Sequence, residues 1–353
     1  MLKRKKLSVG LLLTAMLTMS SVSVYAEEGT NQNKQNPYIE QYLLEQKSKF
    51  IKAPDNPVAD PKAEEQVIKE VLTNYYEGDL KVADLINKLT GDNSLKKQVT
   101  SLVKEDKITV MHKIKDIYSL ATDENEKELF YGYLDRYAQD SGDEIAINFL
   151  EEITPKQTVL SNLNGTLASY NGSAAGDWAY DNYNKYRRDF PRFTGQFGTD
   201  CTNFVSQAMH LAGGKPQSGN WYVSQKNSNY WIINSAAELD NSWSLSDPSP
   251  WISVEEFRDY WKPNATTHGF SRTRYESEHA TIYNRSINKG DVVVLHKGVA
   301  NWMTTPSHLM IISRYDPNKK DFLLAGHSNE RQALPVLEAI ASGPYDYIEF
   351  LEL

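Results

Sequence analysis

The chain has 353 residues, of which 40% are hydrophobic and 24% are charged, a balance typical of a globular protein and not of a disordered one. This length allows one large domain or two modest ones. The formal net charge is −8. Nucleic acid is therefore not an expected partner, because proteins bind its phosphates through clustered Lys and Arg.

Residues 1–26 have the pattern of a signal peptide. A basic run, Lys3–Lys6, precedes an apolar stretch from Leu7 to about Met19, and Val24-Tyr25-Ala26 fits a cleavage site. The apolar stretch is shorter than the ~20 residues of a membrane span, which disfavours the alternative of a retained signal anchor. Cleavage removes four cations and changes the net charge from −8 to −12. We expect a secreted or cell-wall-associated protein with no stable membrane span after cleavage.

The next two segments differ in their periodicity. Residues 27–61 are polar and contain four prolines, which predicts a flexible leader with at most a short helix near Tyr38–Phe50. Residues 62–165 repeat apolar positions at helical spacing and predict a helical N-terminal domain. The expected helices lie near Val67–Tyr75, Leu80–Leu89, Leu95–Val103, Ile108–Leu120 and Glu126–Ala138. No cluster of catalytic residue types stands out there, so a packing or wall-tethering role is favoured over a second active site.

A loop rich in Ser, Asn and Gly at Ser161–Gly176 marks the predicted boundary to a second domain over residues 172–353. Strand-like apolar runs follow at Asp291–Leu295, His308–Ile312 and Phe322–Ala325. Helices first and strands later predict an α+β fold.

Cys201 is the only cysteine in the chain, so an internal disulfide is excluded. An intermolecular link, a reactive thiol and a buried structural residue remain as alternatives. Thr199 or Asp200 can cap a helix that begins near Cys201, and Gly213-Gly214 can end it. At a helix start the free backbone N–H groups and the macrodipole favour a thiolate, and they can also stabilise an oxyanion.

A nucleophilic thiol needs a base that a third group orients. His308 is the preferred base among seven histidines, because it begins an apolar strand that can pack against the helix of Cys201. His210 follows Cys201 by nine residues on the same helix, about 13–14 Å along its axis, and is too far away. A turn at Pro317–Lys320 would bring the end of the next strand beside His308, so that His327 or Asn329 could orient its imidazole.

The stretch Gly198–Gln207, with Gly213-Gly214, resembles the putative amidase domain of Gram-positive secreted proteins, relatives of the CHAP and NlpC-type cell-wall peptidases. Shorter similarities occur at Gly290–Val293, Ser307–Ile312 and Gly326–Ser328, and together the resemblance covers about Trp178 to Arg331.

The resemblance implies a papain-like fold in which the nucleophile helix packs on a small antiparallel sheet. It also implies a Cys201–His308 dyad with His327 or Asn329 as the third polar residue. Gln196, five residues before Cys201, is similar in placement to the upstream oxyanion glutamine of papain-like enzymes.

The sequence therefore predicts a secreted thiol amidase or peptidase without a cofactor or metal. Export and the resemblance together imply a peptide or peptidoglycan-derived substrate. A non-catalytic surface-binding module and an acyl transferase with the same dyad are the alternatives. A metal hydrolase is disfavoured because His268, Glu276, Glu278 and His279 lack a standard ligand spacing. The oligomeric state is not predicted.

Overall fold

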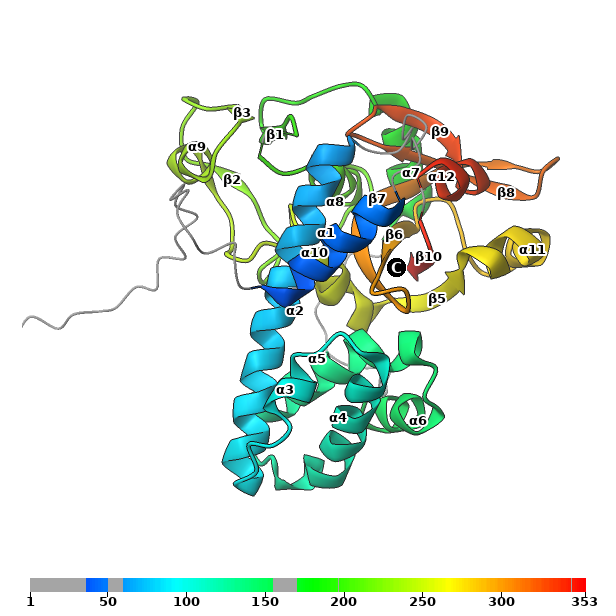
Figure 1. The fold of residues 1–353 in the computed structure, drawn as a ribbon. Coiled ribbons are helices and arrows are strands. Elements are labelled where there is room, and N and C mark those ends of the chain that lie inside the picture. Colours follow the sequence, from blue (N-terminus) through cyan, green and yellow to red (C-terminus); the bar gives the residue numbers. More distant parts are fainter. Residues whose placement is uncertain (1–35, 50–59, 155–169, 196, 344) are drawn as a thin grey trace, which may run out of the picture. The chain divides into compact units, whose positions relative to one another are not determined.

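The computed structural model describes residues 36–49, 60–154, 170–195, 197–343 and 345–353 (Figure 1). The predicted signal peptide, most of the predicted leader and Gln196 lie outside the described residues. The fold is mixed α+β, with a helical N-terminal region followed by a six-stranded antiparallel sheet and its helices. Among the described residues, no helix combines the length and apolar character that crossing a membrane requires.

The N-terminal region consists of α-helices joined by short loops. These helices are α1 (Pro37–Lys49), α2 (Pro61–Thr90), α3 (Lys96–Val99), α4 (Lys104–Ile117), α5 (Glu124–Ser141) and α6 (Glu144–Ile153). Helix α2 begins at Asp60, whose carboxylate accepts hydrogen bonds from the backbone N–H groups of Lys62 and Ala63. It ends at Gly91, which has the left-handed conformation of a C-cap (φ 70°). The two helices expected at Val67–Tyr75 and Leu80–Leu89 are one continuous helix.

A buried polar cluster explains why α2 continues through Asp79 and why the predicted leader contains an ordered helix. The Asp79 carboxylate is fully buried and accepts hydrogen bonds from Lys107, Arg136, Tyr38 and Tyr137 at 2.5–2.9 Å. Burial lowers the pKa of Lys107 to about 8, although Asp79 opposes this shift. Since Tyr38 belongs to α1, the cluster fastens α1 to α2 and α4.

The C-terminal region contains further helices and strands. The helices are α7 (Gly172–Asn182), α8 (Cys201–Leu211), α9 (Ala236–Ser242), α10 (Val254–Trp261), α11 (Arg272–Ile282) and α12 (Val336–Ser342). Two short pairings join β1 (Arg192–Phe193) to β3 (Ile232–Ile233) and β2 (Ser224–Gln225) to β4 (Trp243–Ser244). The main sheet is formed by β5 (Thr266–Ser271), β6 (Val292–Val299), β7 (Met303–Asp316), β8 (Asp321–Gly326), β9 (Arg331–Pro335) and β10 (Tyr347–Glu352).

The sheet has the strand order β5-β10-β6-β7-β8-β9, with antiparallel neighbours throughout. Alternating side chains of β6 and β7 enter two different cores, as expected for a sheet with both faces covered. Leu309 and Ile311 pack with α8 on one face. Met310 and Ile312 pack with α11 and α12 on the other. The three predicted strands correspond to β6, β7 and β8, although β6 begins at Val292, one residue later than predicted. Strand β7 already begins at Met303, so His308 lies inside this strand and not at its mouth.

The β6–β7 hairpin joins the two regions. Its tip passes through Ala300 and Asn301, both in the left-handed conformation. The next residue, Trp302, donates from Nε1 to the carbonyl of Leu102 at 2.8 Å. Val299 and Met303 on either side of the tip belong to the hydrophobic core of the N-terminal helices. The helical region and the sheet therefore share one core at this hairpin.

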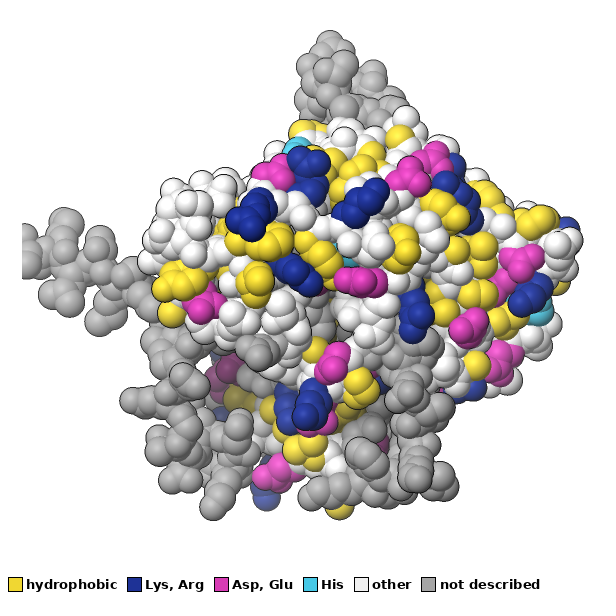
Figure 2. All heavy atoms as spheres, turned by 90° about the horizontal axis from the view of Figure 1, so that it is seen from above, with side chains coloured by type: hydrophobic (Ala, Val, Ile, Leu, Met, Phe, Trp, Pro, Cys, Tyr) yellow, Lys and Arg dark blue, Asp and Glu magenta, His cyan; other side chains and the backbone are white. Residues whose placement is uncertain are grey.

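Charged side chains are interspersed on the surface. Among the described residues on the face shown in Figure 2, Lys and Arg lie between acidic and hydrophobic side chains and form no continuous basic patch. Three of the four residues considered as metal ligands lie beside a residue that can carry the opposite charge. His268 contacts Glu352, Glu276 contacts Arg272, and Glu278 contacts Arg274.

Candidate active site

The start of helix α8 positions Cys201. The preceding loop turns at Gly198 in the left-handed conformation (φ 72°), and Cys201 is the first helical residue after the N-cap Asp200. The Asp200 carboxylate does not cap this helix. Its Oδ1 accepts from the Phe193 backbone N–H at 3.1 Å and from Asn203 Nδ2 at 2.9 Å. Asp200 therefore ties the helix start to strand β1.

The thiol of Cys201 is fully buried among polar neighbours. Its sulfur lies 3.2 Å from Thr199 Oγ1 and 3.8 Å from Thr202 Oγ1, and the backbone N–H of Leu309 in β7 also donates to it. Burial nevertheless raises the pKa of the thiol, because desolvation of a thiolate outweighs these hydrogen bonds. The expectation that the helix start favours a thiolate is thus not met in this buried state.

His308 precedes Leu309, so the sulfur lies against the peptide group that joins these two residues. The imidazole is fully buried, and neither ring nitrogen has a hydrogen-bond partner among the described residues. The thiol and the imidazole are therefore not hydrogen-bonded to each other. His308 pairs with Leu295, whose side chain enters the core on the α11–α12 face. The structure brings the two residues together through the backbone of β7 and not through their side chains.

The ionisation of His308 reflects its surroundings. Burial lowers the pKa of the imidazole to about 4, Glu64 of α2 opposes this shift, and Lys297 of β6 adds to it. The ring is therefore neutral at pH 7, and its low pKa makes it a weak base in this buried state. A neutral thiol and a neutral imidazole are the resting state of this pair.

His327 lies directly after β8, next to helix α8. Its Nδ1 is 2.5 Å from Asp200 Oδ2, and its Nε2 is 3.4 Å from the carbonyl of Asn182. The imidazole lies between two tilted rings, with its centroid 4.1 Å from that of Phe204 and 4.4 Å from that of Tyr186. His327 therefore contacts Asp200 and not His308. Sequence reasoning missed Asp200 in this role, because an acidic residue before a helix is usually a cap.

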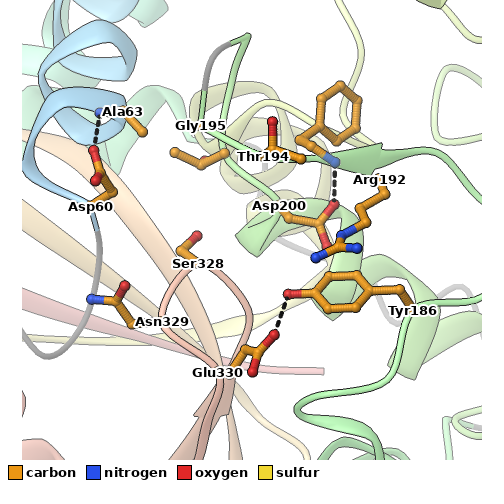
Figure 3. Close-up of a pocket in the computed structure, with 12 residues that line it drawn as sticks. Asp60, Ala63, Tyr186, Arg192, Thr194, Gly195, Asp200, Ser328, Asn329 and Glu330 are labelled. Carbon is orange, nitrogen blue, oxygen red and sulfur yellow. Dashed lines mark hydrogen bonds between the residues drawn. The ribbon is translucent and has the colours of Figure 1, made fainter. Parts of the chain in front are cut away.

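A pocket of about 340 Å³ lies next to the start of helix α8, and Figure 3 shows the residues that line it, which do not include Cys201 or His308. Thr199, which contacts the sulfur of Cys201, also lines this pocket, and so does Asn329 in the β8–β9 turn. The remaining lining residues come from the start of α2, from Tyr186, from β1 with the loop that follows it, and from the β8–β9 turn. They are Asp60, Ala63, Tyr186, Arg192, Phe193, Thr194, Gly195, Asp200, Ser328 and Glu330.

Residues 169–349 match the family described as the Putative amidase domain. The match spans about half of the chain and includes α8, β6, β7 and β8, and the chain belongs to this family. No curated protein and no solved structure matches the chain. Family membership implies a hydrolase that acts on amide bonds, which agrees with the resemblance found in the sequence.

Proposed function

We propose that the protein is a thiol amidase or peptidase of papain-like type, with Cys201 as the nucleophile and His308 as its base. One observation carries this proposal. The only cysteine of the chain begins a helix within the family region, and its sulfur lies against the backbone of His308, whose ring nitrogens have no partner in the described part of the chain. Buried polar groups are normally hydrogen-bonded, so an unpaired buried imidazole is consistent with a partner that arrives with the substrate.

His308 pairs with Leu295 on the α11–α12 face of the sheet and makes no hydrogen bond to the thiol, so the proposed reaction requires a rearrangement of β7 that brings the imidazole to the sulfur. His308 takes the thiol proton, and the thiolate attacks the amide carbonyl carbon. The backbone N–H groups at the start of α8 stabilise the oxyanion, and Gln196 is a further proposed donor. The intermediate expels the amine, which takes its proton from His308. Water then hydrolyses the thioester with His308 as the base.

The two candidates for the third polar residue receive different roles in this proposal. His327, held by Asp200, fastens the β8–β9 turn to the start of helix α8. Asn329 lines the pocket and faces the substrate. His327 thus acts by positioning the nucleophile helix, whereas Asn329 acts by contact.

We further propose that the substrate is a peptide of the cell wall and that the protein reaches it by secretion. Support comes from the signal-peptide pattern of residues 1–26 and from the resemblance to wall-peptide enzymes. An acyl transferase would use the same dyad, with an amine in place of water. A wall-binding module would need neither Cys201 nor a neutral His308.

Mass spectrometry of wall fragments tests the proposal. The wild-type protein should release fragments with new amine and carboxylate ends, whereas Cys201→Ala and His308→Asn should release none while keeping the wild-type circular dichroism. His210→Asn is the matched histidine control, because His210 bonds the Lys215 carbonyl at the far end of the same helix. Cleavage by Cys201→Ala would overturn the proposal. Fragments joined to an added amine would indicate acyl transfer.

A further inference from the structure

The pocket beside Cys201 contains a cation that forms no ion pair with the residues that the structure describes. Arg192 lines this pocket from β1. Its guanidinium makes no hydrogen bond or ion pair among the described residues, and its Nε is buried without a partner. The guanidinium makes cation–π contacts with the rings of Tyr186 and Trp231. Arg192 is half-buried, and a buried Nε–H without a partner is uncommon because buried donors are normally hydrogen-bonded.

Stacking holds this guanidinium in place. Arg192 lies 3.8 Å from the ring of Tyr186, which in turn lies 4.4 Å from the ring of His327. The ring centroids of His327 and Phe204, on the nucleophile helix, lie 4.1 Å apart. The column therefore connects helix α8 to Arg192 through three ring contacts. An arginine fixed on an aromatic face keeps its planar fork of N–H donors available for a ligand.

A second unused donor lies in the same pocket. The Ser328 hydroxyl, in the β8–β9 turn, is buried and has no hydrogen-bond partner among the described residues. The acidic residues of the pocket already accept hydrogen bonds. Asp200 bonds His327, Glu330 bonds the Tyr186 hydroxyl at 3.0 Å, and Asp60 bonds the first turn of α2. The Nε–H of Arg192 is a donor and the Ser328 hydroxyl can act as one, so a ligand with acceptor atoms can satisfy both groups.

We propose that this pocket binds a carboxylate of the substrate, with Arg192 as a forked donor and Ser328 as a second donor. Carboxylates match the guanidinium fork in shape and charge. Thr199 lines the pocket and contacts the thiol, so a carboxylate held there belongs to a residue close to the scissile amide. This inference rests on the proposed function and specifies its substrate class as peptides with a free carboxylate near the cleaved bond.

A matched pair of substrates tests the inference. The test uses two versions of one wall-derived peptide that the wild type cleaves. The first version keeps the free carboxylate nearest the cleaved bond, and the second carries a carboxamide at that position. The wild type should show a KM about tenfold to a hundredfold lower for the carboxylate form, as expected for loss of a charge-assisted hydrogen bond. Arg192→Gln should remove this preference by weakening binding of the carboxylate form alone, and Arg192→Lys should retain part of it.

Arg188→Gln is the matched control, because Arg188 contacts the Trp231 ring at 4.9 Å but does not line the pocket. It should keep the wild-type preference. Equal cleavage of both peptides by the wild type would overturn the carboxylate site and leave the amidase proposal intact. A preference that persists in Arg192→Gln would also overturn it. If the wild type cleaves neither the peptides nor wall fragments, the proposed function itself fails. The wild-type comparison decides the question even if Arg192→Gln does not fold.

Discussion

The ionisation of Cys201 is set by its burial more than by its place in the sequence. The start of a helix and the hydroxyls of Thr199 and Thr202 favour a thiolate. The fully buried position opposes them and raises the pKa of the thiol. Residue spacing could locate the helix start, but burial depends on β7, which lies about a hundred residues further along the chain.

This balance predicts slow alkylation of the resting enzyme. At pH 7, iodoacetamide should modify Cys201 more slowly than it modifies a free cysteine peptide. The alkylation rate of Cys201 should rise with pH, and the pH at the midpoint of this rise should lie above the midpoint for the free peptide. Thr199→Val should slow the reaction further, because it removes a hydrogen bond that stabilises the thiolate. Thr194→Val is the control, since the Thr194 hydroxyl contacts Asn234.

Intact-mass spectrometry measures the alkylation rate, and the single cysteine makes the labelled site unambiguous. Alkylation of the wild type at pH 7 that is faster than that of the free peptide would contradict the raised pKa.

Helix α2 brings a charge to the neighbourhood of His308. The Glu64 carboxylate is fully buried, accepts from the Ser307 hydroxyl at 3.2 Å, and forms an ion pair with Lys297. Glu64 raises the pKa of His308 and Lys297 lowers it, while burial dominates and brings the value to about 4. The N-terminal helix thus takes part in the electrostatics of the candidate site, a contact that no local sequence pattern reveals.

The signs of these two effects give a test by NMR titration of His308. Glu64→Gln should lower the pKa of the imidazole, and Lys297→Gln should raise it. Both changes break the same ion pair, so a mere loss of packing would shift the pKa in the same direction in both variants. If both variants shift the pKa of His308 in the same direction, the electrostatic account is contradicted.

The same titration has a consequence for stability. The folded-state pKa of His308, about 4, lies below its ordinary value of about 6.5, so protonation favours the unfolded chain. The stability that neutral His308 contributes is present above about pH 6.5 and is lost as the pH falls toward 4.

Local periodicity identified some elements and missed others. The helices α4 and α5 and the strands β6, β7 and β8 follow apolar spacing that is visible in the sequence. Strand β10, at Tyr347–Glu352, was missed although it lies between β5 and β6 in the sheet. It is short, and its place in the sheet depends on pairing with strands tens of residues away.

At the scale of the whole molecule, the helical region and the sheet depend on each other through the β6–β7 hairpin. Trp302 at the hairpin tip packs against the core of the N-terminal helices and bonds the Leu102 carbonyl. Sequence reasoning placed a boundary near Ser161–Gly176. That boundary marks a change of composition along the chain. Trp302, which follows the boundary, packs on helices that precede it.

Trp302→Ala should therefore destabilise the whole protein by about 2–4 kcal/mol, less than a fully buried tryptophan costs, because Trp302 is only partly buried. Asn301→Gly is the control, since glycine accepts the left-handed conformation of that tip residue. Denaturant unfolding should show a single transition, with the helical and aromatic signals lost together. Two separate transitions in the wild type, or no change in Trp302→Ala, would contradict the shared core.

The candidate site shows the same division between local and distant information. Cys201 and His308 could be proposed from the sequence because each begins a recognisable local pattern, and the resemblance supports both. Arg192, Asp200 and Glu64 were not found, since their significance lies in contacts with the β8–β9 turn, His327 and β7 respectively. These contacts follow from the fold and have no signature in neighbouring residues.

The most direct test of the central claim compares alkylation of Cys201 with amide cleavage. Protein samples are treated with iodoacetamide to increasing extents, the labelled fraction is measured by intact mass, and each sample is assayed on wall peptides. If Cys201 is the nucleophile, the remaining activity should equal the unlabelled fraction and vanish when every molecule carries one label. Full labelling with undiminished cleavage would contradict the claim.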